Sequence, residues 1–264
     1  MPEVTKPYTP GTPCWVDLVV PDQREALDFY RDLFGWQGEP GPPETGGYAV
    51  CSLNGKAVAG IMTSMAQEGG SKPPPAWTTY LAVGDADDAM EKINNNGGTS
   101  LMDPMDVLTL GRMAVVADST GAVFGIWQAK DFLGSQVVNE PGSVVWNELN
   151  TADPNTAAAF YSEALGVTAA PMEEAPGYFA LKAGGRVVGG MQDLEKSPPG
   201  SPSHWLTYFS VDDTDSTVDA LVKAGGNVLK PPFDMVAGRM AVVQDPQGAV
   251  FALINATGPS PEAG

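Results

Sequence analysis

An internal repeat constrains the fold of this 264-residue chain more than any other feature of its sequence. Residues 15–35 match residues 146–166, with a Trp, an acidic residue, a Leu, a Phe-Tyr pair and a Gly at shared positions. Near the end of each half, GRMAVVADSTGAVFGIW at 111–127 matches GRMAVVQDPQGAVFALI at 238–254. Self-similarity of this extent indicates that one folding unit has been duplicated within the chain.

The repeat predicts two domains, at residues 1–133 and 143–264, joined by a linker at 134–142. The linker holds Gly134, Pro141 and Gly142, which are typical of loops. A chain that is 43% hydrophobic has enough apolar material to build a core in both domains.

Each half divides again into two units that read as a strand, a helix and further strands. In the first unit, Asp22 is a candidate helix N-cap and Gly35 a candidate helix end. The Asn54-Gly55 pair predicts a tight hairpin, and apolar spacing predicts a second helix over 85–95. Strands of the first half are expected at 14–20, 48–53, 57–63, 77–83, 112–117 and 122–128.

This arrangement resembles the vicinal oxygen chelate superfamily of glyoxalases, bleomycin resistance proteins and dioxygenases. The segments PDQREALDFYRDLFGW and ADPNTAAAFYSEALGV, and the endings ADSTGAVFGIW and QDPQGAVFALI, carry the resemblance over residues 12–256. The pattern is most similar to an actinobacterial two-domain subgroup often labelled hydroxylases or antigens. The resemblance implies an α+β fold of four βαβββ units, which form two glyoxalase-like cups in tandem.

The resemblance also implies where a metal ion would be bound. Metal-dependent members place His, Glu or Gln at four strand positions in each cup. Three of these correspond here to Trp15 and Trp146, Thr78 and Leu206, and Gly125 and Ala252. The fourth falls in the strands 48–53 and 178–183, which contain no His, Glu or Gln. These side chains cannot form an oxygen and nitrogen ligand set, so we expect no metal and no other cofactor.

Charge narrows the range of partners. The chain has 14 basic and 32 acidic residues and a net charge of −18, which disfavours nucleic acid and anionic membranes and favours a cationic partner. No apolar run is long enough to span a membrane, and residues 1–12 have no apolar core typical of a signal peptide. We expect a cytoplasmic protein that acts as a monomer or homodimer and binds a small molecule.

Asp17 and Glu148 are the candidate catalytic residues. They follow Trp15 and Trp146 by two residues, and in a strand this spacing places both side chains on one face. If that face lines the cup, burial would perturb the carboxyl pKa and allow the group to act as a general base. The same carboxylate could instead contact a cationic or hydroxyl-bearing ligand, or bond structurally to backbone or an Arg.

Aromatic, Met and polar side chains make up the candidate ligand-binding set. Flat aromatic walls suit a planar apolar ligand, although several of these rings could simply fill the core. Arg112 and Arg239 could bind an anion, or form an ion pair with Asp106 or Asp234, or with Asp17 or Glu148. The full set is Trp15, Met62, Trp77, Tyr80, Arg112, Trp127, Trp146, Gln192, His204, Trp205, Tyr208 and Arg239, with Met113 and Met191 as further soft lining.

The leading interpretation is metal-independent binding of an apolar or aromatic, cationic or neutral small molecule, as an accessory or resistance protein in secondary metabolism. One alternative is a metal-free enzyme, such as an isomerase, cyclase or hydroxylation helper, that uses Asp17 or Glu148 as base. Another is a structural or protein-binding role with both cups filled. Trp127 corresponds to Ile254 in the repeat, so one cup can bind while the other is structural.

Overall fold

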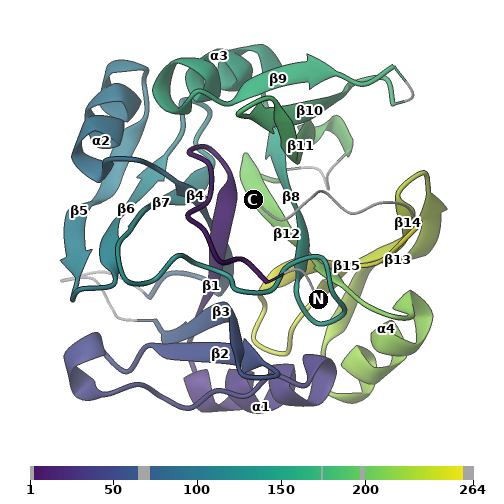
Figure 1. The fold of residues 1–264 in the computed structure, drawn as a ribbon. Coiled ribbons are helices and arrows are strands. Elements are labelled where there is room, and N and C mark those ends of the chain that lie inside the picture. The colour runs from purple at the N-terminus through teal and green to yellow at the C-terminus, as the bar shows by residue number, and fades with distance from the viewer. Residues whose placement is uncertain (1–2, 65–71, 174, 197–199, 258–264) are drawn as a thin grey trace.

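The computed structural model describes residues 3–64, 72–173, 175–196 and 200–257. Each half of the chain forms one mixed sheet, in the order β2-β3-β1-β4-β7-β6-β5 for the first half and β13-β14-β15-β12-β8-β11-β10-β9 for the second (Figure 1). This architecture confirms the predicted α+β fold of two tandem domains.

The strands of the first sheet are β1 (Pro13–Val20), β2 (Ala49–Leu53), β3 (Lys56–Thr63), β4 (Ala76–Ala82), β5 (Thr99–Val107), β6 (Gly111–Ala117) and β7 (Val123–Ala129). Those of the second are β8 (Val144–Thr151), β9 (Thr168–Pro171), β10 (Tyr178–Ala183), β11 (Arg186–Asp193), β12 (His204–Ser210), β13 (Asn227–Met235), β14 (Gly238–Gln244) and β15 (Val250–Ala256). The α-helices are α1 (Gln23–Phe34), α2 (Ala86–Asn95), α3 (Pro154–Leu165) and α4 (Thr214–Lys223), and short 3-10 turns cover Pro43–Thr45 and Leu194–Lys196.

Each of these α-helices begins after an Asp whose side chain accepts hydrogen bonds from backbone N–H groups of the first turn. Asp22 has this role before α1, as predicted, and Gly35 ends α1 in the left-handed conformation with a φ of 75°. An N-cap carboxylate satisfies donors that the helix leaves unpaired.

The strands β5 and β13 are absent from the sequence prediction. They form the outer edges of the two sheets and are mostly exposed, so they lack the apolar alternation of a half-buried strand. Both contain proline, which is tolerated at sheet edges because the missing N–H need not pair there.

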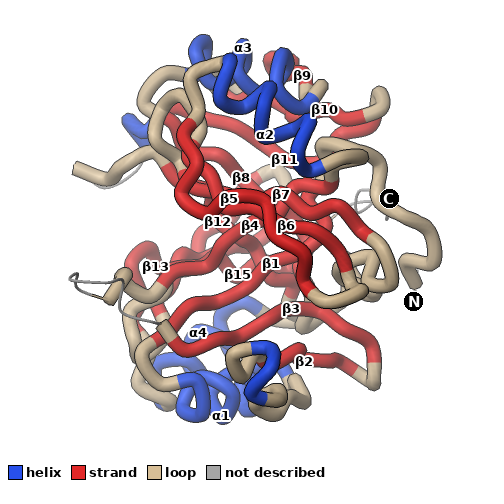
Figure 2. Tube along the Cα trace, turned by 90° about the vertical axis from the view of Figure 1, so that its left-hand side faces the viewer, coloured by secondary structure: helices blue, strands red, loops and turns tan. Residues whose placement is uncertain are grey.

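The two halves share their hydrophobic cores. One buried cluster joins Tyr30 and Phe34 of α1 to Phe209 and Phe251 of the second half. A second cluster joins residues of α2 and β7 to residues of α3, β8 and β11. Correspondingly, α1 lies by α4 and α2 by α3, at opposite ends of the molecule with the sheets between them (Figure 2).

Buried hydrogen bonds also cross between the halves. The Tyr30 hydroxyl donates to Asp245 Oδ2 at 3.0 Å, and the Tyr161 hydroxyl donates to Asp118 Oδ2 at 2.9 Å. Both aspartates lie in the hairpin that precedes the last strand of each half, and both are less than 5% exposed. Within the described residues, no helix combines the length and the apolar character needed to cross a membrane.

Candidate functional site

A buried carboxylate lies at the centre of the first sheet, where aromatic residues surround it. Asp17 on β1 is 4% exposed and accepts hydrogen bonds at Oδ2 from the Tyr80 hydroxyl at 3.0 Å and the Tyr48 hydroxyl at 3.3 Å. The Trp15 indole Nε1 donates to the Tyr48 hydroxyl at 2.7 Å. We call these four residues, Trp15, Asp17, Tyr48 and Tyr80, the first tetrad.

The second sheet repeats this arrangement around Glu148 on β8, which is also 4% exposed. The Tyr208 hydroxyl donates to Glu148 Oε1 at 3.0 Å, and the Trp146 Nε1 donates to the Tyr178 hydroxyl at 3.0 Å. The Tyr178 hydroxyl also acts on the Glu148 carboxyl, whose pKa it lowers. Trp146, Glu148, Tyr178 and Tyr208 form the second tetrad.

A glycine makes room for one tyrosine in each tetrad. Gly60 on β3 is paired in the sheet with Asp17, and Gly190 on β11 is paired with Glu148. A Cβ atom at Gly60 or Gly190 would overlap the hydroxyl of Tyr48 or Tyr178. The absence of a side chain at these positions therefore lets each hydroxyl reach the carboxylate.

Tyr48 and Tyr178 were missed from sequence. Both directly follow a glycine; Tyr48 immediately precedes β2, and Tyr178 is the first residue of β10. Aligning the two halves through these Gly-Tyr pairs would have shown that the residue type is shared. It would not have shown that the hydroxyl reaches the carboxylate, because that contact runs across three strands.

Burial dominates the electrostatics of both carboxyl groups. Removal from water raises the pKa of Asp17 to about 7, against the opposing effect of the hydrogen bonds from Tyr80 and Tyr48. Burial likewise raises the pKa of Glu148, although Tyr178, Tyr208, Asn150 and Gln192 all bond to it. The first carboxyl is thus poised between its charged and neutral forms near neutral pH.

The tetrads do not fit a metal ion. Each contributes one carboxylate, and the groups around it, tyrosine O–H and indole N–H, act here as hydrogen-bond donors rather than ligands. Across the described parts of the chain, no group of three or more His, Cys, Asp or Glu is arranged to hold a metal ion.

The first tetrad lies beneath a cap formed by residues 3–12 and 130–138. Tyr8 and Val4 from the first segment and Phe132 and Val138 from the second belong to the same apolar cluster as Trp15. The Phe132 ring lies 4.9 Å from the Trp15 ring, centroid to centroid, in an edge-to-face contact. The Tyr8 hydroxyl donates to the Ser135 carbonyl at 2.7 Å and ties the two cap segments together.

The second tetrad is more accessible. Trp146 is partly exposed, whereas Trp15 is 7% exposed, and the equivalent tyrosines Tyr48 and Tyr178 are both partly exposed. As far as the described residues show, the apolar cluster beside the second tetrad consists only of side chains from its own strands, including Phe233, Met240 and Ile254. Nothing in that cluster corresponds to the cap of the first cup.

Several predicted residues join these cups. Trp127 lies in the first-cup cluster, and its Nε1 donates to the Phe132 carbonyl at 2.9 Å. Met62 is paired with Val19 on the neighbouring strand. In the second cup, Gln192 Nε2 donates to Glu148 Oε1 at 2.8 Å, and His204 is paired with Asn150 of β8.

Trp77 and Trp205 lie elsewhere. Each is three residues before the tetrad tyrosine of its strand, and an odd spacing in a strand places side chains on opposite faces. Their Nε1 atoms donate to the hydroxyls of Tyr30 and Tyr161 in the cores between the halves. Met191 lies in the same buried cluster as Trp205. The structure therefore corrects the expectation that Trp77, Trp205 and Met191 line a cup.

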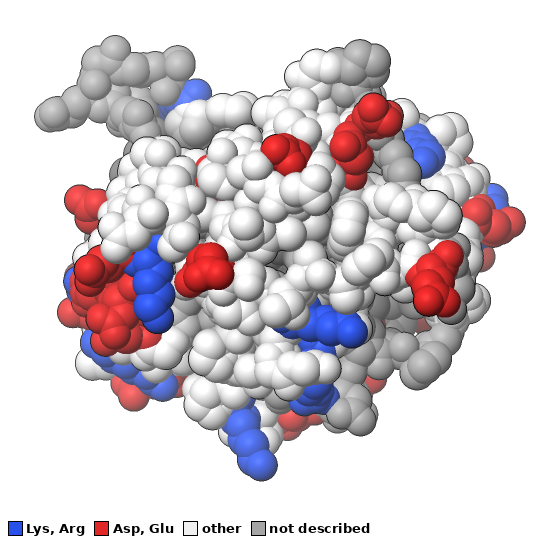
Figure 3. All heavy atoms as spheres, turned by 90° about the horizontal axis from the view of Figure 1, so that it is seen from above, with Lys and Arg blue, Asp and Glu red and all other residues white. Residues whose placement is uncertain are grey.

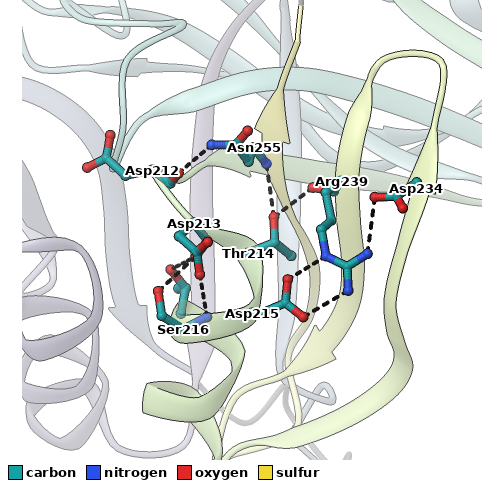
Figure 4. A network of polar contacts seen from close by, with 9 residues as sticks. Asp212, Asp213, Thr214, Asp215, Ser216, Asp234, Arg239 and Asn255 are labelled. Carbon is teal, nitrogen blue, oxygen red and sulfur yellow. Dashed lines mark hydrogen bonds and ion pairs between the residues drawn. The ribbon is translucent and has the colours of Figure 1, made fainter.

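Arg112 and Arg239 are held in ion pairs. Arg112 binds Asp87 through two hydrogen bonds of 2.9 Å and lies 3.7 Å from Asp106. Figure 4 shows Arg239 between Asp215 at the start of α4 and Asp234 on β13. The predicted partners Asp106 and Asp234 are confirmed, while Asp87 and Asp215 had not been predicted. None of these ion pairs involves a residue of either tetrad.

A solvent-open groove of about 540 Å³ lies between α2 and α3, away from both tetrads. Its lining mixes small residues with Asp85, Asp88, Lys92 and Glu163, without an aromatic side chain. On the face seen in Figure 3, Lys and Arg side chains are scattered among acidic ones. Because the groove is open to solvent and has no aromatic lining, we regard the tetrads as the candidate site.

Comparison with known proteins agrees with this architecture. The model of the Glyoxalase/Bleomycin resistance protein/Dioxygenase superfamily matches residues 13–126 and 136–253. The chain is 45% identical over 262 residues, 97% of both chains, to CFP32 of Mycobacterium tuberculosis (strain CDC 1551 / Oshkosh), whose name assigns it provisionally to the glyoxylases. It is 38% identical over 266 residues, 94% of both chains, to the anthracycline biosynthesis protein DnrV of Streptomyces peucetius.

Among solved structures, a Mn(II)-bound glyoxalase from Novosphingobium aromaticivorans is similar with a TM-score of 0.64 and 15% identity. That similarity covers 97% of this chain and 85% of the other, and at this identity it concerns the fold alone. The two family matches, one in each half, together with these relatives, establish that the chain belongs to the Glyoxalase/Bleomycin resistance protein/Dioxygenase superfamily.

Proposed function

We propose that the protein binds an apolar or aromatic small molecule in its second cup, without a metal ion, as an accessory or resistance protein in secondary metabolism. The observation that carries this proposal is the contrast between the tetrads. Trp146 is partly exposed beside a buried carboxylate, whereas its equivalent Trp15 is buried beneath a cap.

The chemistry of the second cup supports an aromatic ligand with a positive charge or a hydroxyl group. Trp146, Tyr178 and Phe233 offer flat apolar surface, and the Glu148 carboxylate attracts a cation or accepts a hydrogen bond. A net charge of −18 adds a favourable field for a cation. Relatives are named for anthracycline biosynthesis, and anthracyclines combine a planar ring system with an amino sugar.

A metal-free enzyme is the second candidate, and the raised pKa of Asp17 favours it. A base with a pKa of about 7 suits proton transfer at neutral pH. Two observations weigh against this candidate. Asp17 lies beneath the cap, and Glu148 accepts hydrogen bonds at Oε1 from Tyr208, Gln192 and Asn150, which stabilise the charged carboxylate and make it a weaker base.

Isothermal titration with doxorubicin, an anthracycline, tests the binding proposal. We expect one site per chain with a micromolar dissociation constant, in protein that elemental analysis shows to be free of stoichiometric metal. Trp146→Phe should weaken binding on the order of tenfold, because the smaller phenyl ring offers less contact area and cannot donate the hydrogen bond to Tyr178. The matched Trp15→Phe variant should bind as the wild type does.

Absence of binding at micromolar concentration would contradict the proposal, as would equal effects of the two Trp variants. The enzymatic alternative makes a separate claim. It requires that Glu148→Gln and Asp17→Asn together abolish turnover of an enolisable substrate while binding remains, and an unchanged rate would exclude it.

A further inference from the structure

A row of polar side chains crosses the second cup beside Glu148, where the first cup has apolar side chains. Adjacent positions on β11, β8 and β12 carry Gln192, Asn150 and His204, which we call the polar row. The same positions on β3, β1 and β4 carry Met62, Val19 and Ala76, the apolar row.

The polar row shares a sheet face with the second tetrad. Residues paired directly across neighbouring strands point to the same side, and so do residues separated by an even number along one strand. Asn150 is two residues after Glu148 and its Nδ2 donates to Glu148 Oε1 at 3.4 Å. His204 is four residues before Tyr208, whose hydroxyl bonds to the same carboxylate.

The hydrogen bonds within the row leave its acceptor atoms for a ligand. The Gln192 amide nitrogen donates to Glu148 Oε1 at 2.8 Å and to Asn150 Oδ1 at 3.0 Å, so its carbonyl oxygen is the atom that can accept. His204 Nδ1 lies 2.8 Å from the Pro202 carbonyl. Because a carbonyl only accepts, Nδ1 carries the hydrogen, and Nε2 of the neutral ring is an acceptor.

We propose that the polar row determines ligand specificity by selecting aromatic molecules that carry a hydroxyl or amino group at the edge facing it. This inference rests on the proposed function, because it assumes that the second cup binds. Gln192 and His204 are both partly exposed, so a ligand can reach them. An aromatic molecule without a donor at that edge would leave their acceptors unpaired when it displaces water.

Two probes that differ only in donors test the inference: 2,6-dihydroxynaphthalene and 2,6-dimethoxynaphthalene. Dissociation constants for both are measured by isothermal titration with the wild-type chain at pH 7. We expect the dihydroxy probe to bind roughly tenfold more tightly, since it can donate to the row. The variant Gln192→Met/His204→Ala, which copies two residues of the apolar row, should bind both probes equally and keep the wild-type affinity for the dimethoxy probe.

The variant leaves Asn150 in place because that residue is 2% exposed and bonded to Glu148. Met62→Gln, which introduces the amide at the matching position of the first cup, is the matched control and should change neither constant. Near-ultraviolet circular dichroism checks that each variant is folded.

Equal affinity of the two probes for the wild type would overturn the inference while leaving the proposed function intact. A donor preference that survives in Gln192→Met/His204→Ala would also overturn it, because the selection would then come from another group. Binding of neither probe, or of doxorubicin, would count against the proposed function and the inference together.

Discussion

The two cups share a tetrad but differ in what surrounds it. In each, the Trp donates a hydrogen bond to one Tyr, and the other Tyr donates to the carboxylate. The first tetrad is covered by Phe132 and Tyr8 of the cap and flanked by the apolar row. The second is partly open and flanked by the polar row. The same tetrad thus lies beneath a cap in one half and has a partly exposed Trp in the other.

Replacing the two tetrad tryptophans should reveal the largest difference between the cups in the free energy of unfolding. Trp15→Ala is expected to lower the free energy of unfolding by about 3–5 kcal/mol, because it leaves a cavity beneath the cap. Trp146→Ala should cost about half as much, because its partly exposed ring buries less surface. Urea denaturation measures both, and equal losses would show that the second cup is as closed as the first.

Adding a methyl group beneath each tyrosine tests whether the tetrads are built alike. Gly60→Ala and Gly190→Ala should each lower the free energy of unfolding by about 1–3 kcal/mol, because the new Cβ displaces a tyrosine hydroxyl. Tyr48→Phe and Tyr178→Phe remove the overlapping atom. Combined with the matching alanine, each should therefore restore part of the loss in a double-mutant cycle, and additive losses would refute the overlap.

The carboxyl groups should make stability depend on pH in the same direction in both cups. Folded Asp17, with a pKa raised from 3.8 to about 7, keeps a proton that the unfolded chain has released. Its contribution is therefore fully present below pH 3.8 and is lost as the pH rises towards 7, by at most about 1.4 kcal/mol per pH unit. Glu148 has the same sign above its ordinary value of 4.5.

Unfolding midpoints measured between pH 4 and 8 check this dependence. In the comparison variants Asp17→Asn and Glu148→Gln, the replaced side chain no longer titrates. The stability of the wild type relative to each variant should fall as the pH rises. Parallel profiles for wild type and variant would mean that the carboxyl in question has an ordinary pKa.

The arginine ion pairs should have the smallest effect and should not distinguish the cups. Arg112→Ala and Arg239→Ala are each expected to leave the urea unfolding midpoint close to that of the wild type, since water screens ion pairs whose partners lie at the surface. Binding of doxorubicin should not change. A large loss of affinity in either variant would show that these arginines take part in binding the ligand.

Much of the site was predictable because strand geometry relates neighbours along the chain. The two-residue spacing of Trp15 and Asp17 correctly indicated a shared face. The same rule predicts that Trp77 and Tyr80, three residues apart, point to opposite faces of the sheet, as the structure shows. Tyr48 could be found only as a shared residue type, because its contact with Asp17 depends on the pairing of β1, β3 and β2.

The sequence by itself determined the duplication, the helix caps at Asp22 and its equivalents, and the residue types at the metal positions, because these depend on local spacing and composition. Only the tertiary structure decided that the cores are shared between halves, through contacts such as Tyr30 with Asp245, 215 residues apart. It alone decided that residues 3–12 and 130–138 close the first cup. Segments without periodicity carry no local signal of where they dock, and their position is fixed by the apolar surface they cover.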